Sequence, residues 1–484
     1  MNPHYSSTRP FGDANQDIIV VIAYRNDLNI AWAMEYILAC KKHNKYRSLR
    51  VLDLSHHNVC NETSPLVSLW NFLTKRKLVL PKYFSTWNAS HQLPITISPR
   101  TTFTVLMKSF LESLKIMFRM TPDLNTEQTP EALVRSVHSS IANKLSTVNY
   151  IPFLHPLAIF YRVLAFSRAE HETQQILNQY ESPLLIVPNG RFPVSAGAVY
   201  AAAQRKVMVK YLERGGSPGM LNVFDQSPHS MIERRESLER IWSSATSTFP
   251  DLAKAISRVY LDLRLAVDPH SGIQWNRRRN FSQSELIDKF SQGRSLIVFF
   301  TSTELEFAVF QEPSHPRYHP NQSTALQSLL EVIDSSRFAV VVRRHPQKKF
   351  SLFDRERQLW RTLRKENDLL WFGPRSTIDS YMLAKRAQFV FHFNSGIGAE
   401  LIELGHEGVI SLGPSPWLDP NSLASCGSSE QIEDRLRSNK KIDLREQVWK
   451  WGYFQVMAGT MFAEVEWRSG RMVLPADFQS LKDQ

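Results

Sequence analysis

The sequence has little of the chemistry that marks redox or metal-dependent proteins. Cysteine occurs three times in 484 residues, at Cys40, Cys60 and Cys426, which lie far apart and lack metal-ligand spacing. Such sparse cysteine argues against both a disulfide framework and a zinc site. The sequence also has no Asp-x-Asp pair and no His, Asp or Glu cluster with metal spacing. We therefore expect no metal and no bound cofactor.

Signatures of several nucleotide-binding and hydrolytic proteins are missing too. No Gly-x-Gly-x-x-Gly follows the first apolar run at 17–23, which weakens any prediction of dinucleotide binding there. The Walker A pattern is absent, which argues against a P-loop NTPase.

Long apolar runs are also lacking. No run approaches the roughly 18 residues that a membrane-spanning helix needs, and the nearest, 153–166, is interrupted by His155, Pro156 and Arg162. The polar start at 1–5 lacks the apolar region of a secretory signal. We expect a cytoplasmic location, with peripheral contact at the inner face of a membrane left open.

One segment bears on that contact. Residues 103–120 are amphipathic and include Lys108, Lys115 and Arg119. Two interpretations are open: a helix that packs its apolar side on the core, or a helix that lies on a membrane surface. The packed helix is the favoured prediction.

The composition that is present is that of a folded, basic protein. Hydrophobic residues make up 43% of the chain and charged residues 21%, and 484 residues exceed one ordinary core, so two domains are expected. The net charge of +12 predicts an anionic partner, such as a phosphate ligand, an acidic glycan, a membrane surface or nucleic acid. Nucleic acid is disfavoured, because the basic residues are spread out and no RNA- or DNA-binding motif occurs.

Alternating strand and helix patterns predict an α/β protein with two Rossmann-like, doubly wound domains that face a cleft. The first half has predicted strands at 17–23, 49–54, 183–187 and 206–212, with a largely helical stretch between the second and third. The second half has predicted strands at 295–300, from 338, at 388–393 and at 409–412, separated by helices. We place the first domain at 1–285, the second at 286–440, and terminal helices that pack back toward the first domain at 441–484.

Polar residues follow the predicted strand that starts at 338. Pro346 restricts His345 to an extended conformation and ends the strand, which leaves the imidazole beside Arg343 and Arg344. A cationic strand end of this kind suits a pyrophosphate or a phosphate leaving group, to which His345 can donate a proton or hydrogen bond. The alternative is a solvated basic turn.

A second polar set follows the predicted strand at 388–393. Asn394, Ser395, Gly396 and Gly398 come between this strand and a helix, where small residues let the backbone approach a ligand and the helix N-terminus attracts phosphate. Glu400 could hydrogen-bond a ribose. The alternative is that Ser395 only caps the helix and Glu400 only complements its dipole.

Other candidates lie at predicted strand ends. Arg191 and Arg214 could bind donor phosphates or an acceptor, and Glu213 could act as a general base. Glu304 and Glu306, which follow the strand at 295–300, are further candidates for the base.

The order of these motifs resembles that of the capsule polysaccharide biosynthesis proteins, which are GT-B-type glycosyltransferases of bacterial surface glycans. The motifs are Asn-Gly-Arg at 189–191, Glu-Arg-Gly-Gly at 213–216, Thr-Ser-Thr-Glu-x-Glu at 301–306, Arg-x-His-Pro at 343–346, Asp-Ser-Tyr at 379–381 and Ser-Gly-Ile-Gly-Ala-Glu at 395–400. The resemblance covers about 183–425 and is thinner over 17–60. More distantly, the pattern is similar to the Kdo and sialic acid transferases with a His-Pro motif and to the CDP-glycerol glycerophosphotransferases.

The resemblance implies a GT-B-like fold in which 1–285 binds the acceptor and 286–440 binds the donor. It implies that His345 contacts the donor phosphate, that Ser395 and Gly396 form the phosphate-binding loop, and that Glu400 holds the ribose. Such enzymes are metal-independent. The sequence departs from the family at 405–408, where Gly-x-Pro is usual, and at Asn394, where a small or hydroxylated residue is more common.

We therefore expect a glycosyltransferase that moves a sugar from a nucleotide-activated donor to a surface or capsular polysaccharide, or to a lipid-linked glycan. Glu213 or Glu306 would deprotonate the acceptor, while His345 and the arginines would stabilise the departing phosphate. The alternatives are a CDP-linked polyol-phosphate transferase, a nucleotide-sugar epimerase of similar fold and, among non-enzymes, a basic nucleic-acid-binding protein.

Overall fold

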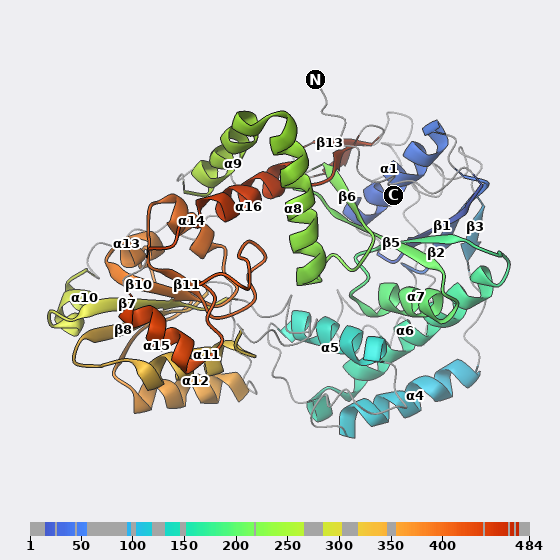
Figure 1. Ribbon diagram of the computed structural model, residues 1–484. Coiled ribbons are helices and arrows are strands. Elements are labelled where there is room, and N and C mark those ends of the chain that lie inside the picture. The colour runs from blue at the N-terminus through green and yellow to red at the C-terminus, as the bar shows by residue number, and fades with distance from the viewer. Residues whose placement is uncertain are drawn as a thin grey trace. The chain divides into compact units, whose positions relative to one another are not determined.

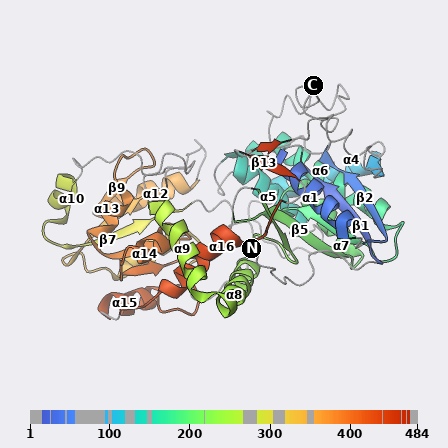
Figure 2. The ribbon, with the colours of Figure 1, turned by 90° about the horizontal axis from the view of Figure 1, so that it is seen from above.

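The chain forms two compact units, each built on a mainly parallel sheet with helices on both faces (Figures 1 and 2). This computed structural model describes residues 15–24, 27–43, 46–55, 94–97, 103–118, 131–145, 152–216, 219–265, 284–302, 318–345, 355–438, 441–462, 465–468 and 471–473. Unit 1 comprises 1–144, 151–229 and 457–484, and unit 2 comprises 145–150 and 230–456. The predicted α/β class with two Rossmann-like halves is confirmed, whereas the predicted cleft stays a prediction.

Unit 1 contains a seven-stranded sheet with the order β12-β6-β5-β4-β1-β2-β3. The strands are β1 (Asp17–Ile22), β2 (Ser48–Asp53), β3 (Ile95–Ile97), β4 (Leu184–Pro188), β5 (Met208–Arg214), β6 (Met220–Phe224) and β12 (Thr460–Met461). Strands β1 to β5 pair in parallel, and β6 and β12 extend one edge in antiparallel register. Two short strands, β13 (Glu466–Arg468) and β14 (Arg471–Val473), form a separate antiparallel pair.

Alternation along β1 explains why helices cover both faces of this sheet. Ile18 and Val20 pack with residues of α1 (Asp27–His43), whereas Ile19 and Val21 pack with residues of α6 (Pro156–Leu177) and α7 (Pro193–Gln204). Successive side chains of a strand point to opposite faces, so a strand that is apolar throughout must be buried on both. The unit also contains α4 (Phe103–Phe118), α5 (Glu131–Leu145) and the short helix η2 (Pro152–Leu154).

Helix α4 faces the opposite way from the favoured prediction. Its buried residues are Val105, Ser109, Glu112 and Ser113, whereas five of its large apolar residues are exposed, namely Phe103, Met107, Phe110, Leu111 and Phe118. The amphipathic pattern is confirmed, but the apolar side does not pack on the core. No helix in the described part of the chain has both the length and the apolar composition needed to cross a membrane.

Unit 2 contains a five-stranded sheet with the order β11-β10-β7-β8-β9, and all its pairings are parallel. The strands are β7 (Ser295–Phe300), β8 (Phe338–Arg343), β9 (Leu369–Phe372), β10 (Ala387–His392) and β11 (Val409–Ser411). The helices are α8 (Met231–Thr248), α9 (Pro250–Leu265), α10 (Ser284–Ser291), α11 (Gln322–Val332), α12 (Arg355–Glu366), α13 (Ser380–Lys385), α14 (Ile397–Glu403), α15 (Ser429–Arg437) and α16 (Arg445–Met457). Two core clusters, one on each face of the sheet, bury alternate residues of β7.

Helices α8 and α9 belong to unit 2 because they pack on α16. The Trp242 and Tyr453 rings meet edge to face, with centroids 5.9 Å apart. Gly452 lets α9 approach closely, since a Cβ there would lie 2.3 Å from Ser257 Oγ. The chain therefore divides after His229, whereas the division predicted from the sequence lies at residue 285. Beyond α16 the chain returns to unit 1.

Candidate functional site

The strand order of unit 2 gives its sheet a topological switch point between β7 and β10. The chain leaves the central strand β7 toward β8 on one side and later returns to β10 on the other. Open α/β sheets bind ligands at such a point, outside the carboxyl ends of the strands. Here those ends lead into Thr301 and Ser302 after β7, and into Asn394 and Ser395 after β10.

The loop after β7 is held by buried hydrogen bonds. The fully buried Gln322 accepts from the Ser302 N–H at 2.8 Å and donates to the Ser302 carbonyl at 3.2 Å. Thr301 Oγ1 accepts from the His345 N–H at 2.9 Å, which ties the end of β8 to the end of β7. The predicted base candidates Glu304 and Glu306 lie outside the described residues.

At the end of β8, the Arg343 side chain donates hydrogen bonds to backbone carbonyls of the protein itself. Its Nη1 donates to the carbonyls of Arg344 and Gly373 at 2.9 and 2.7 Å, and burial lowers the pKa of this guanidinium to about 10. The Arg344 guanidinium carbon lies 5.9 Å from the centre of the Trp371 ring. His345 is half-buried at this strand end, so it is the more accessible of the three predicted cationic residues.

The loop after β10 rests on a histidine that sequence reasoning missed. His392, the last residue of β10, is fully buried, and burial lowers its pKa to about 3, which keeps the ring neutral. Its Nδ1 accepts from the Ser395 N–H at 3.4 Å, and its ring stacks on Trp417 with centroids 5.6 Å apart. Asn394, which directly precedes Ser395, has φ +50°, a left-handed conformation that asparagine tolerates. The only signal in the sequence is a histidine at the end of an apolar strand.

Helix α14 follows this loop and has seven residues. Its N-cap, Gly396, makes no side-chain cap, and the Ile397 N–H reaches Ser395 Oγ at 3.4 Å. Gly398 lets α14 approach the His392 ring closely, because a Cβ there would lie 2.5 Å from His392 Nε2. Of the predicted donor-binding residues, the structure thus brings Asn394, Ser395, Gly396 and Gly398 together in one turn.

Glu400 lies in the first turn of α14 and is buried. Its Oε2 accepts a hydrogen bond of 2.7 Å from the Tyr381 hydroxyl. Asp379, the first residue of the Asp-Ser-Tyr motif, is the N-cap of α13 and accepts from the Tyr381 and Met382 N–H groups. The ribose-binding role of Glu400 stays a prediction.

The sheet of unit 1 has its own switch point, between β1 and β4. Asn189 and Gly190 follow β4 with φ +62° and +75°, a tight left-handed turn. Asn189 Nδ2 lies 2.5 Å from Glu213 Oε2 and 2.7 Å from His229 Nε2, and Glu213 and His229 approach to 3.7 Å. The Glu213 side chain keeps 20% exposure. The structure therefore joins the predicted base to a histidine that the sequence did not single out.

The two predicted arginines of unit 1 differ in setting. Arg191 is buried, its Nε donates to Ser139 Oγ on α5, and its guanidinium lies 5.0 Å from the Phe192 ring centre. Arg214 is exposed at the end of β5, and its N–H donates to Glu213 Oε1 at 3.0 Å. Arg214 is therefore the better placed of the two to reach a ligand.

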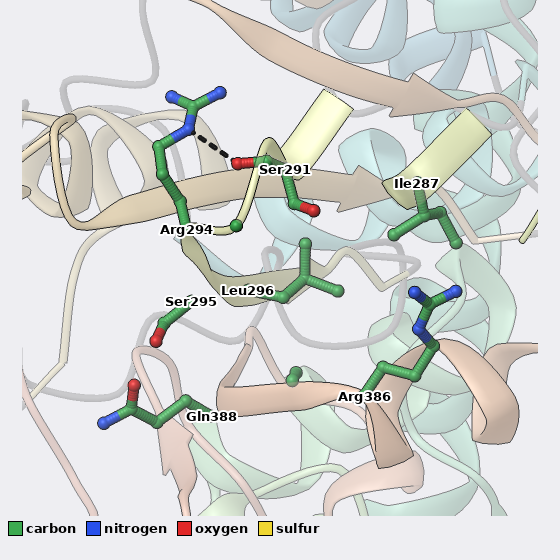
Figure 3. Close-up of a pocket in the computed structure, with 9 residues that line it drawn as sticks. Ile287, Ser291, Arg294, Ser295, Leu296, Arg386 and Gln388 are labelled. Carbon is green, nitrogen blue, oxygen red and sulfur yellow. Dashed lines mark hydrogen bonds between the residues drawn. The ribbon is translucent and has the colours of Figure 1, made fainter. Parts of the chain in front are cut away.

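A cavity of about 380 Å³ lies at the amino-terminal ends of the unit 2 strands, near the starts of β7 and β10. Figure 3 shows Arg294, Arg386 and Gln388 around it. Arg386 is paired with Asp288, and Arg294 donates to backbone carbonyls of α10. None of the predicted site residues lines this cavity. Within the described ranges, no group of three or more His, Cys, Asp or Glu side chains could hold a metal ion.

Comparisons with protein-family models and with curated proteins give no match. Similar solved structures include the UDP-GlcNAc 2-epimerase of Methanocaldococcus jannaschii in complex with UDP-GlcNAc and UDP, which is 11% identical over 90% of this chain and 98% of that chain, with a TM-score of 0.27. Another is the UDP-GlcNAc 2-epimerase of Neisseria meningitidis bound to UDP-GlcNAc, which is 12% identical over 92% of this chain and 96% of that chain, with a TM-score of 0.25. TM-scores this low carry no argument about function. The assignment of each unit as a doubly wound α/β fold rests on its own strand order.

Proposed function

We propose that this chain is an enzyme that acts on a nucleotide-activated sugar and binds its nucleotide at the switch point of unit 2. The observation that carries the proposal is the strand order there. It brings the polar loop at Thr301–Ser302 beside the loop at Asn394–Gly396, at the ends of adjacent parallel strands. This is where open α/β sheets bind nucleotides. The net charge of +12 supports an anionic ligand.

The proposed reaction is transfer of the sugar to a hydroxyl of a glycan acceptor. The acceptor oxygen bonds to the anomeric carbon, its proton passes to a base, and the bond to phosphate breaks with its electron pair on the nucleotide. We assign the base to Glu213, because its carboxylate is held by Asn189 yet stays 20% exposed. His345, half-buried at the end of β8, would stabilise the departing phosphate without a metal.

A second candidate is epimerisation of the sugar on its nucleotide. The observation that favours it is the Glu213–His229 pair, with 3.7 Å between Oε2 and Nε2 and one Asn189 amide touching both. Inversion of a carbon centre removes one proton and returns another. A carboxylate and an imidazole side by side could serve as base and acid. An altered sugar formed without acceptor would identify this reaction.

The nucleotide-binding part can be tested with a matched pair of serines. Thermal shift against CMP-, CDP-, UDP- and GDP-sugars would identify a ligand, and titration would give its Kd. Ser395→Ala should weaken binding by about 10 to 100-fold if its hydroxyl contacts a phosphate. Ser291→Ala, at the amino-terminal ends of the strands, should leave Kd unchanged. Equal Kd values for both variants and the unmodified chain would refute the assignment.

The chemical part is tested separately. Glu213→Gln keeps the size of the side chain and should lower kcat by about 100 to 10,000-fold, with nucleotide binding intact. The exposed Glu181→Gln in the same unit is the control. Products are compared with and without acceptor, which separates transfer from epimerisation. Undiminished turnover by Glu213→Gln would exclude Glu213 as the base.

A further inference from the structure

Helix α4 is packed with its polar side inward. The residues that it buries include Ser109, Glu112 and Ser113, and both serine hydroxyls donate back to carbonyls of α4 itself, at 2.7 and 2.5 Å. These small side chains let α4 lie close along α6, and Lys108 of α4 reaches Glu170 of α6. The inner side of α4 is thus fully committed to unit 1.

The outer side of α4 is apolar, and so is what lies beside it. Phe118 at the end of α4 meets Phe153 of η2, with ring centroids 6.4 Å apart. Figure 1 shows α4 at the periphery of unit 1, beside α6. The outer apolar surface is defined by Phe103, Met107, Phe110, Leu111, Phe118 and Phe153, which are 75%, 41%, 48%, 52%, 70% and 61% exposed.

Positive charge borders this surface. Lys108 pairs with Glu170 and Lys115 pairs with Glu112, and in each pair the ammonium is the exposed partner. The lysine side chains are 53% and 36% exposed, whereas the two carboxylates are 11% and 10% exposed. The only acid of α4 therefore points inward, and the chain continues into Arg119 directly after the helix. Viewed from solvent, α4 offers aromatic and aliphatic side chains with cations at one border.

We infer that the outer side of α4, with Phe153, lies on a membrane surface that contains anionic lipid. Interfacial helices combine large apolar residues on one side with lysine or arginine at the border, where the ammonium groups reach lipid phosphates. Lipid matches both the exposed aromatic residues and the outward cations, whereas a protein partner would need acidic groups matched to Lys108 and Lys115. The inference stands on this surface alone and does not depend on the proposed function.

The test uses the full chain and vesicles of phosphatidylcholine with or without 30% phosphatidylglycerol. We expect flotation with the anionic vesicles and much weaker binding to phosphatidylcholine alone. The double variant Phe110→Asp, Leu111→Asp should bind at least about 100-fold more weakly, because two apolar side chains lose their insertion and two anions are added. The matched control, Phe249→Asp with Leu252→Asp, changes residues that are 55% and 57% exposed at the junction of α8 and α9, and should bind as the unmodified chain does.

A second variant tests the cations without touching the apolar side chains. Replacing Lys108 and Lys115 by glutamine should weaken binding to anionic vesicles by about fivefold for each charge, and added salt should abolish that difference. Circular dichroism checks that every variant is folded. Absence of flotation by the unmodified chain would overturn the inference, as would equal binding of the aspartate variant. If the unmodified chain does not bind vesicles but self-associates as its concentration rises, and the aspartate variant does not self-associate, the surface would be assigned to a second copy of the chain instead.

Discussion

Acid should weaken unit 2 through His392, and the size of the effect follows from its burial. The ring is fully buried, and its pKa falls from an ordinary 6.5 to about 3 because the charged form would lose its hydration. Below pH 6.5 the His392 ring binds a proton in the unfolded chain but not in the folded chain. The contribution of the neutral His392 to the free energy of unfolding is therefore complete above pH 6.5 and is lost progressively as the pH falls toward 3. At pH 5 the loss is about 2 kcal/mol from this residue alone.

The perturbation is His392→Asn, which keeps an acceptor near the Ser395 N–H and removes the titration. Urea unfolding followed by circular dichroism gives the free energy of unfolding at pH 7.5, 6.5, 5.5 and 5.0. The variant starts lower because the smaller side chain leaves a void. Between pH 7.5 and 5.0, the free energy of unfolding of the variant should then fall by about 2 kcal/mol less than that of the unmodified chain.

A control separates packing from titration. Trp417→Phe removes part of the ring stacked on His392 and should lower stability by a similar amount at every pH. Other histidines, such as the half-buried His138, whose pKa desolvation lowers to about 4, keep their own acid sensitivity in all three proteins. Parallel stability curves for His392→Asn and the unmodified chain would refute the claim that His392 is buried and neutral.

Two further substitutions test local geometry. Gly190→Ala should destabilise unit 1 by about 1 to 3 kcal/mol, because φ is +75° and the added Cβ would lie 2.5 Å from the Tyr211 ring. The control is Gly373→Ala, which has no atom within 4 Å of its Cβ and should lose less stability in thermal unfolding. Equal losses of stability in the two variants would contradict the turn geometry. Tyr381→Phe removes the 2.7 Å donor to the buried Glu400 and should cost about 1 to 3 kcal/mol in urea unfolding, and an unchanged midpoint would show that this hydrogen bond contributes nothing.

Much of the fold could be predicted because parallel strands buried on both faces are continuous apolar runs. The segments Ser295–Phe300 and Phe338–Arg343 are of this kind, and the predicted starts of both strands match the structure. The strands β6 and β12 escaped prediction because they are short, with five and two residues, and pair in antiparallel register at one edge of the sheet. Residue patterns also left open which way α4 faces, since an amphipathic pattern reveals an apolar side but not what covers it.

The candidate site was predictable only where a residue directly follows a predicted strand, at 206–212 or 388–393. Asn394 and Ser395 were found in that way, and so was Glu213 at the end of β5. His229 lies 40 positions from Asn189 and meets it only because the β5–β6 hairpin brings the chain back. His392 was hidden inside the predicted apolar strand at 388–393. Such residues become visible only when the tertiary contacts are known.

The most direct measurement is a crystal structure of the full chain with the nucleoside diphosphate that raises its melting temperature most. The account predicts that the pyrophosphate lies within hydrogen-bond distance of the loops at Thr301–Ser302 and Asn394–Gly396, at the carboxyl ends of β7 and β10. A nucleotide bound instead in the cavity between Arg294 and Arg386, at the amino-terminal ends of the strands, would contradict it. So would a chain that no nucleotide stabilises.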